Sequence, residues 1–204
     1  MKEKEIIFAA RLLSVVFTPF FLPLLGIIIL FLLSYLKLYD MKFKLSVIFL
    51  VWLFTVILPT LLIRAYRRYH GWTLIQLGAR ERRMVPYVIS ILCYFCCLYI
   101  MSLLHITYFI TSVIVAALIV QIICAIINVW WKISTHTAAI GGVTGALIAF
   151  SFLANFNPIW WLCLTLIVAG CVGTSRMILR QHTLPQVVGG FFIGLISAYV
   201  TIFF

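Results

Sequence analysis

The stretch that decides the fold is "YFITSVIVAALIVQIICAIINV", residues 108–129, in which no residue carries a charge. An apolar run of about 20 residues is long enough to cross a bilayer as a helix. Comparable runs occupy residues 20–36, 45–63, 87–104, 137–153, 159–174 and 187–204. None sustains the alternation of outer-membrane strands, and a helix satisfies its own backbone groups in lipid. We therefore predict an all-α, polytopic transmembrane helical bundle with six or seven spans.

The composition is typical of an integral membrane protein. Apolar residues make up 66% of the 204 residues, charged residues only 9%, and the formal net charge is +11. No ordinary soluble domain combines these values. The polar intervals are short, so we predict one integral membrane domain over residues 1–204, with its functional site at helix ends in the membrane interface.

The N-terminal segment, residues 1–19, allows two interpretations. It is either part of one long span or an interfacial helix that ends at the two prolines of "TPFFLP", residues 18–23. Its positive start resembles a signal peptide, but the apolar run is too long and lacks a small-residue cleavage site. We therefore expect the segment to remain in the mature chain.

Acidic side chains are too few for several kinds of chemistry. The chain has four Asp and Glu residues against fifteen Lys and Arg residues. A glycosidase-type carboxylate pair, a hard-metal site and a three-ligand zinc site each need ligands that the sequence does not bring together. We expect no metal, no cofactor and no nucleic-acid partner, and we look instead to the cations and imidazoles.

Those groups gather in three clusters, "RAYRRYHGWTLIQLGARERRMVPY" (64–87), "WWKISTHTAAIGG" (130–142) and "TSRMILRQHTLPQVVGG" (174–190). Two spans separate each cluster from the next, so all three should lie at the same membrane face. Arginine and lysine bind phosphate oxygens, and histidine acts as nucleophile, acid or base. The clusters therefore indicate phosphoryl chemistry, although basic residues at helix ends also serve as topological anchors.

Two of the clusters resemble motifs of the type 2 phosphatidic acid phosphatase superfamily of membrane lipid phosphatases. "SRMILRQH", residues 175–182, matches its Ser-Arg, five residues, His signature, and "ISTH", residues 133–136, is similar to its Pro-Ser-Gly-His motif. The family's first motif, Lys, six residues, Arg-Pro, has only the degenerate counterpart "RERRMVP", residues 80–86. The three motifs fall within residues 80–190.

One position departs from the family in an informative way. Gln186 stands four residues after His182, where the family usually has Asp. An amide oxygen still accepts a hydrogen bond from the imidazole, but without the electrostatic help of a carboxylate. "HTLPQV", residues 182–187, is similar to the His-Thr-x-x-Gln-Val pattern of dolichyl pyrophosphate phosphatases. Gln186 thus marks either this branch or a weakened site.

The resemblance implies a role for each matching residue. His182 would attack phosphorus and form a phosphohistidine, while His136 protonates the leaving oxygen and then activates water. Gln186 would orient His182. The residues that would bind the phosphate oxygens are Arg176, Lys132, Ser134 and one or more of Arg80, Arg82 and Arg83.

Glycines follow both histidines at helical spacing, at Gly141, Gly142 and Gly145 and again at Gly189, Gly190 and Gly194. Small residues let membrane helices approach closely, so we predict that the helices after His136 and His182 pack together. The alternative is that these glycines form a dimer face.

The resemblance implies a bilayer-resident lipid phosphate as substrate, with a polyprenyl pyrophosphate such as undecaprenyl pyrophosphate favoured. Phosphatidylglycerophosphate, phosphatidic acid and lipid A phosphates are alternatives. Outside hydrolysis, the open alternatives are a lipid phosphotransferase, a non-catalytic protein that binds anionic lipid, and a transporter. We expect the bacterial inner membrane, with the site at its periplasmic face.

Overall fold

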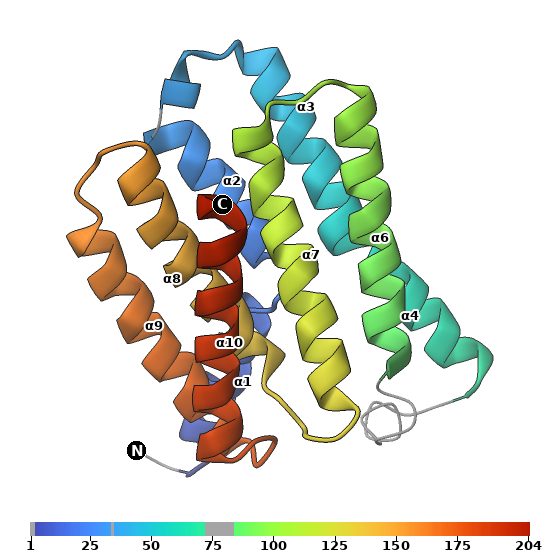
Figure 1. The fold of residues 1–204 in the computed structure, drawn as a ribbon. Coiled ribbons are helices and arrows are strands. Elements are labelled where there is room, and N and C mark those ends of the chain that lie inside the picture. Colours follow the sequence, from blue (N-terminus) through green and yellow to red (C-terminus); the bar gives the residue numbers. More distant parts are fainter. Residues whose placement is uncertain (1–2, 34, 72–83) are drawn as a thin grey trace.

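The described part of the chain contains six long apolar helices, which run roughly side by side along one common direction (Figure 1). The structure, a computed structural model, describes residues 3–33, 35–71 and 84–204. The candidate spans are Met41–Tyr69, Met84–Leu103 (α6), Tyr108–Asn128 (α7), Thr135–Leu153 (α8), Ile159–Ile178 (α9) and Leu184–Phe203 (α10). The predicted all-α, polytopic helical bundle is therefore confirmed.

The N-terminal segment is broken at its prolines. Helix α1 covers Glu3–Val16 and helix α2 begins at Leu22 and ends at Leu33, with residues 17–21 outside both helices. Pro19 lies in this break, and Pro23 lies in the first turn of α2, where its missing N–H costs no helical hydrogen bond. The segment is therefore not one continuous helix: α1 and α2 are separate helices joined by residues 17–21. At 12 residues, α2 is shorter than the six candidate spans.

The first long span is irregular near its centre. It consists of α3 (Met41–Trp52), a π-helical turn η2 (Leu53–Ile57) and α4 (Leu58–Tyr69), and the short 3₁₀ turn η1 (Tyr35–Leu38) precedes it. The π turn comes immediately before Pro59, which cannot donate a backbone hydrogen bond and whose ring crowds the preceding turn. The wider turn accommodates the proline without ending the span.

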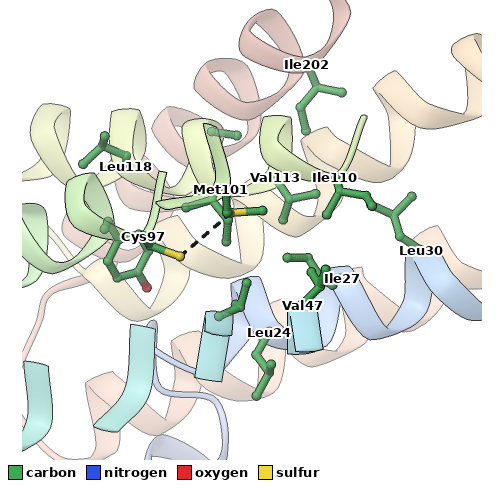
Figure 2. Close-up of a cluster of buried hydrophobic side chains, with 14 of the residues drawn as sticks. Leu24, Ile27, Leu30, Val47, Cys97, Met101, Ile110, Val113, Leu118 and Ile202 are labelled. Atoms are coloured by element: carbon green, nitrogen blue, oxygen red, sulfur yellow. Dashed lines mark hydrogen bonds between the residues drawn. The ribbon is translucent and has the colours of Figure 1, made fainter. Parts of the chain in front are cut away.

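The largest buried cluster joins α2, α3, α6, α7, α8 and α10. Figure 2 shows part of it, with Leu24 and Ile27 of α2 near Val47 of α3 and with side chains of α6 and α7 above them. Within α6, the Cys97 thiol donates to the Met101 thioether sulfur at 3.9 Å. This cluster fills the half of the bundle that is distant from the polar helix ends described below.

Helices α8 and α10 have the closest contact in the bundle, and glycines make it possible. A Cβ added at Gly194 would lie 1.8 Å from the Ala138 carbonyl oxygen, and one at Gly141 would lie 2.0 Å from that of Phe191. Backbone atoms cannot yield as a flexible side chain can, so these positions accept only glycine. The predicted close approach of the two helices is therefore confirmed. Gly141 and Gly194 make this contact between helices of the same chain.

Candidate active site

The polar clusters lie at one end of the bundle. In Figure 1 the α7–α8 loop, the α9–α10 loop, the end of α4 and helix α1 are all at the lower end of the molecule. Each pair of clusters is separated by an even number of spans, so the chain returns to the same face each time. The degenerate first motif cannot be placed in this way, because Arg80, Arg82 and Arg83 lie outside the described residues.

The first turns of α8 and α10 are joined directly. The backbone N–H of Ser134 donates to the carbonyl oxygen of Gln186 at 3.3 Å. A Cβ at Gly190 would lie 2.6 Å from the Ser134 carbonyl oxygen and 2.7 Å from Thr137 Oγ1, so only glycine leaves room for this crossing. The two helix starts that carry His136 and His182 are therefore held together by backbone contacts.

Ser134 caps α8 from a fully buried position. Its exposed fraction is 0%, and its Oγ accepts from the Thr137 backbone N–H at 3.4 Å. Serine at this position supplies one of the acceptors that the first turn of a helix otherwise lacks. The positive end of the α8 backbone consequently points toward the same region as His136, which favours an anion there.

His182 is held by the side chain of Gln186. Nδ1 of His182 lies 3.3 Å from Gln186 Oε1, and the same oxygen accepts from the Thr183 backbone N–H at 3.1 Å. Because a backbone N–H is always a donor, the atom that faces it is the amide oxygen rather than the amide nitrogen. Nδ1 must then carry the proton in the neutral ring, and Nε2 carries the lone pair. This is the tautomer that a nucleophilic histidine attacking through Nε2 requires.

Arg176 is a buried cation with neutral neighbours. Its exposed fraction is 9%; Nη1 donates to Ser14 Oγ at 3.4 Å, and Nη2 donates to Gln181 Oε1. Its Nε has no hydrogen-bond partner among the residues that the structure describes. In the described part of the chain, no carboxylate pairs with this guanidinium. A buried positive charge without a counter-ion is costly, so the site is suited to an anion that supplies the missing partner.

His136 lies beside Arg176. Arg176 and His182 are both within electrostatic range of its ring, and the backbone of Ser14 is within hydrogen-bonding range. Its Nδ1 is buried and has no hydrogen-bond partner within residues 3–33, 35–71 and 84–204. Two orphaned polar atoms, Arg176 Nε and His136 Nδ1, thus come from adjacent helices in one region, where a phosphoryl group would satisfy both.

Lys132, another predicted phosphate ligand, lies at the edge of the site. Lys132 lies in the loop between α7 and α8, two residues before Ser134, and is exposed. Trp131, next to it, places its ring 3.0 Å from where a Cβ on Gly189 would be. The loop is thereby packed on the start of α10, near His182.

Two residues in the site were not predicted. Gln181 lies inside the motif "SRMILRQH", directly before His182, so its position in the sequence could have indicated that it belongs to the site. Ser14 carried none, because 162 residues separate it from its partner Arg176 and only the packing of α1 on α9 brings them together.

A cavity of about 260 Å³ adjoins this region, between α2, α6, α7, α8 and α10. Its lining along α8 extends from Thr135, the neighbour of His136, through Ala139 and Ala146 to Ala154. With 1.5 Å of rise per residue, these 19 steps span about 28 Å, nearly the thickness of a hydrocarbon core. The lining is predominantly apolar, and it reaches Thr135 but includes neither His136 nor His182.

The arrangement offers no obvious metal site. Among residues 3–33, 35–71 and 84–204, no three His, Cys, Asp or Glu side chains cluster closely enough to hold an ion. All six cysteines are free. The charged and polar groups that converge here are those suited to binding a phosphate: a guanidinium, two imidazoles and helix N-termini.

Comparison with known proteins agrees with this geometry. No curated protein and no solved structure matches the chain. Residues 130–204 match the family model described as PAP2 superfamily, a range that includes Lys132, Ser134, His136, Arg176 and His182. The first-motif arginines and Ser14 lie outside the matched residues. The match supports the PAP2 superfamily for residues 130–204 and, together with the six apolar helices found among the described residues, is consistent with a membrane-embedded lipid phosphatase in general.

Proposed function

We propose that this chain hydrolyses the phosphate monoester or pyrophosphate headgroup of a membrane lipid through a phosphohistidine on His182. The observation that carries the proposal is the contact of Gln186 Oε1 with both His182 Nδ1 and the Thr183 N–H. It assigns the proton to Nδ1 and the lone pair to Nε2. Arg176, buried and without a carboxylate partner among the described residues, supplies the positive charge for the phosphoryl group.

The reaction has two steps. In the first, Nε2 of His182 attacks the terminal phosphorus, the N–P bond forms and the bond from phosphorus to the leaving oxygen breaks as His136 gives that oxygen a proton. In the second, water attacks the phosphorus, His136 accepts the water proton, and the N–P bond breaks to release phosphate and restore His182. General acid–base help of this kind typically contributes 10²- to 10⁴-fold.

The negative charge that develops on the equatorial oxygens is met by cations without a metal ion. Arg176 is the central one, and we assign supporting contacts to Lys132, to Ser134 and to one or more of Arg80, Arg82 and Arg83. Removing one preorganised donor to such a charge typically costs about 3 kcal/mol of barrier.

For the lipid, we propose a polyprenyl pyrophosphate such as undecaprenyl pyrophosphate. The predominantly apolar cavity along α8 supports this assignment, because a prenyl tail has no polar atoms that would need partners there. The resemblance of "HTLPQV" to the dolichyl pyrophosphate phosphatase pattern points the same way. Phosphatidylglycerophosphate, phosphatidic acid and lipid A phosphates are the comparison substrates for the experiment below.

We also propose that the protein resides in a bacterial inner membrane with the site facing the periplasm. The stretch "KLYDMKFK", residues 37–44, covers the end of η1 and the first turn of α3 at the end of the bundle opposite the site (Figure 1). Its lysines suit a cytoplasmic location. Labelling of single cysteines introduced at Lys42 and at Arg180, in a background without the native cysteines, tests this. A membrane-impermeant maleimide applied to intact cells should label position 180 and not position 42; the reverse pattern would place the site in the cytoplasm.

The central experiment measures phosphate release by the purified protein from the four lipid phosphates. His182→Asn and His136→Asn are compared with His105→Asn, a histidine change in the turn between α6 and α7 at the opposite end of the bundle. His105 has φ of 51°, a conformation that asparagine adopts readily, so this variant should stay folded and active. Loss of release only in the first two variants supports the mechanism.

Other results would favour the alternatives. A folded wild-type protein that releases no phosphate from any lipid but binds them would indicate a non-catalytic lipid-binding protein or a transporter. Release that depends on an added acceptor lipid, with the phosphate recovered on that acceptor, would indicate a phosphotransferase. Full activity in His182→Asn would contradict the phosphohistidine mechanism.

A further inference from the structure

We propose that Ser14 of the N-terminal helix α1 is a positioning residue of the phosphate site, which holds Arg176 and His136 in place without neutralising them. The proposal rests on the function proposed above and extends the site to a segment outside the part of the chain that matches the PAP2 superfamily. The contacts that support it are the hydrogen bond from Arg176 Nη1 to Ser14 Oγ at 3.4 Å and the position of the Ser14 backbone beside the His136 ring.

Helix α1 presents Ser14 to the site through its small-residue side. Ala10 and Ser14, four residues apart and hence on the same face of the helix, are 3% and 8% exposed. α1 packs against α9, the helix that carries Arg176. On other sides of α1, the side chains of Phe8, Leu12 and Val15 are more than half exposed, as expected for a helix in contact with lipid. The membrane and α9 together therefore fix the position of Ser14.

The chemistry of the two acceptors explains why a serine is suitable. A guanidinium has five N–H donors in one plane, and Arg176 uses Nη1 and Nη2 on two neutral oxygens, those of Ser14 and Gln181. Neutral acceptors fix the orientation of this plane but leave the positive charge available. A carboxylate in the same position would form an ion pair with Arg176 and compete with the substrate phosphate.

Ser14 also links two helices of the site. Its hydroxyl contacts a residue of α9, and its backbone is close to a residue of α8. The two atoms without a partner among the described residues, Arg176 Nε and His136 Nδ1, belong to the residue that Ser14 contacts and to the residue whose ring its backbone lies beside. Its contacts thus restrain the two groups on which a phosphoryl group would bind and react.

The alternative is that Ser14 acts only as a small residue that lets two helices pack closely. Ser14→Ala separates the two roles, because alanine is as small, has a higher helix propensity and lacks only the hydroxyl. A purely packing role predicts unchanged catalysis in this variant. The positioning role predicts a loss of about tenfold in kcat/KM, similar to other residues that orient a reacting group through a hydrogen bond.

The experiment uses the full-length protein in detergent or vesicles with the substrate on which the wild type is active. The variants are Ser14→Ala, Ser14→Thr, Ser14→Asp and, as matched control, Ser112→Ala. Ser112 lies in α7, is 1% exposed and donates its hydroxyl to the Phe109 carbonyl oxygen, away from the site. For each variant we would measure kcat/KM, the inhibition constant of orthovanadate and the melting temperature.

We expect Ser14→Ala to lower kcat/KM and weaken vanadate inhibition by about tenfold while its melting temperature stays near that of the wild type. Ser14→Thr should recover most of the loss because it keeps the hydroxyl. Ser14→Asp should lose activity far more than Ser14→Ala, and Ser112→Ala should retain it. Vanadate mimics the five-coordinate phosphoryl state, so its inhibition constant reports on the geometry of the site and not on stability.

Two results would overturn the proposal. If the wild type is active and Ser14→Ala equals it in kcat/KM and vanadate inhibition, Ser14 is a packing residue and the proposed function stands unaltered. Activity retained in Ser14→Asp would equally exclude a position next to the phosphate. If instead the wild type releases no phosphate from any lipid, the proposed function fails and the role of Ser14 fails with it.

Discussion

Gln186 Oε1 lies 3.3 Å from Nδ1 of His182 and 3.1 Å from the backbone nitrogen of Thr183. One amide oxygen therefore completes the capping box of α10 and sets the tautomer of the candidate nucleophile. The amide does this without a negative charge, in a chain with only four acidic residues. In the proposed mechanism Gln186 would thus take the orienting role that the resemblance assigns to a carboxylate.

Changes at Gln186 test whether orientation or charge matters more. Gln186→Leu removes the acceptor for both donors and should lower kcat by at least tenfold, since a hydrogen-bond partner that orients a histidine typically contributes 10- to 100-fold. Gln186→Glu keeps the reach of the side chain and adds a negative charge that favours the imidazolium ring formed when His182 is phosphorylated. It should be at least as active as the wild type in phosphate-release assays. A wild-type rate in Gln186→Leu would mean that His182 needs no orienting partner.

Replacement of His136 should separate the two chemical steps. His136→Asn lacks the base that activates water, so phosphate should remain on His182 after the first turnover when the leaving group departs easily. We expect an acid-labile, base-stable phosphoprotein after incubation with ³²P-labelled pyrophosphate lipid, and steady-state release at least 10²-fold below the wild type. The double variant with His182→Asn should not become labelled; if it does, another residue is the nucleophile.

Arg176 should not tolerate lysine. Arg176→Lys retains the charge but cannot reach Ser14, Gln181 and a phosphate together from one planar group. We expect kcat/KM to fall about 10²-fold, which corresponds to the loss of a preorganised donor. The control is Arg180→Lys, an exposed arginine four residues later, which should behave like the wild type. Equal effects of the two changes would show that Arg176 contributes only general positive charge.

The glycines of α10 and α9 should respond oppositely to alanine. Gly190→Ala places a Cβ 2.6 Å from the Ser134 carbonyl oxygen, so the two helix starts must separate, at a cost of about 2 kcal/mol in the free energy of unfolding. Gly170→Ala meets no atom within 4 Å and should be neutral or stabilising by up to about 1 kcal/mol. Thermal unfolding in detergent measures both. Equal melting temperatures would contradict the tight crossing of α8 and α10.

The cavity along α8 should select for the tail. Ala146 lies 11 residues from Thr135, about 16 Å along the helix. Ala146→Phe should therefore impair turnover of long-tailed lipid phosphates and leave the turnover of substrates with tails too short to reach Ala146 nearly unchanged. Ile167→Phe, at an exposed position on α9, is the control and should affect neither. A uniform effect of Ala146→Phe on short and long tails would exclude the cavity as the tail site.

Much of the bundle followed from local pattern. Uninterrupted apolar runs predict membrane helices because the backbone N–H and C=O groups must form hydrogen bonds with one another in lipid. The parity of the spans then placed the second and third clusters at the same end of the bundle, and the glycines after His136 and His182 predicted the contact between α8 and α10. The N-terminal segment was ambiguous, since the same residues suit one long span or two helices, and the choice depends on how α1 packs on α9.

Within the site, the motif "SRMILRQH" identified Arg176 and His182 by spacing, and Gln186 by its place one helical turn after His182. What these side chains contact depends on the three-dimensional arrangement. Hydrogen-bond direction and burial arise only when elements meet, so the sequence could not tell that Gln186 shares one oxygen between a ring and a backbone N–H. It could not tell either that Arg176 is buried.

The sequence by itself determined that the chain is a helical membrane protein with a basic, histidine-containing face, because hydrophobic length and charge position are local properties. Only the tertiary structure decided that Ser14 joins Arg176 and His136, since 162 residues separate Ser14 from Arg176 and no spacing rule relates them. The same holds for the cavity along α8, which α2, α6, α7, α8 and α10 line together. Contacts of that kind depend on how helices pack, and packing is a property of surfaces that meet and not of any one segment.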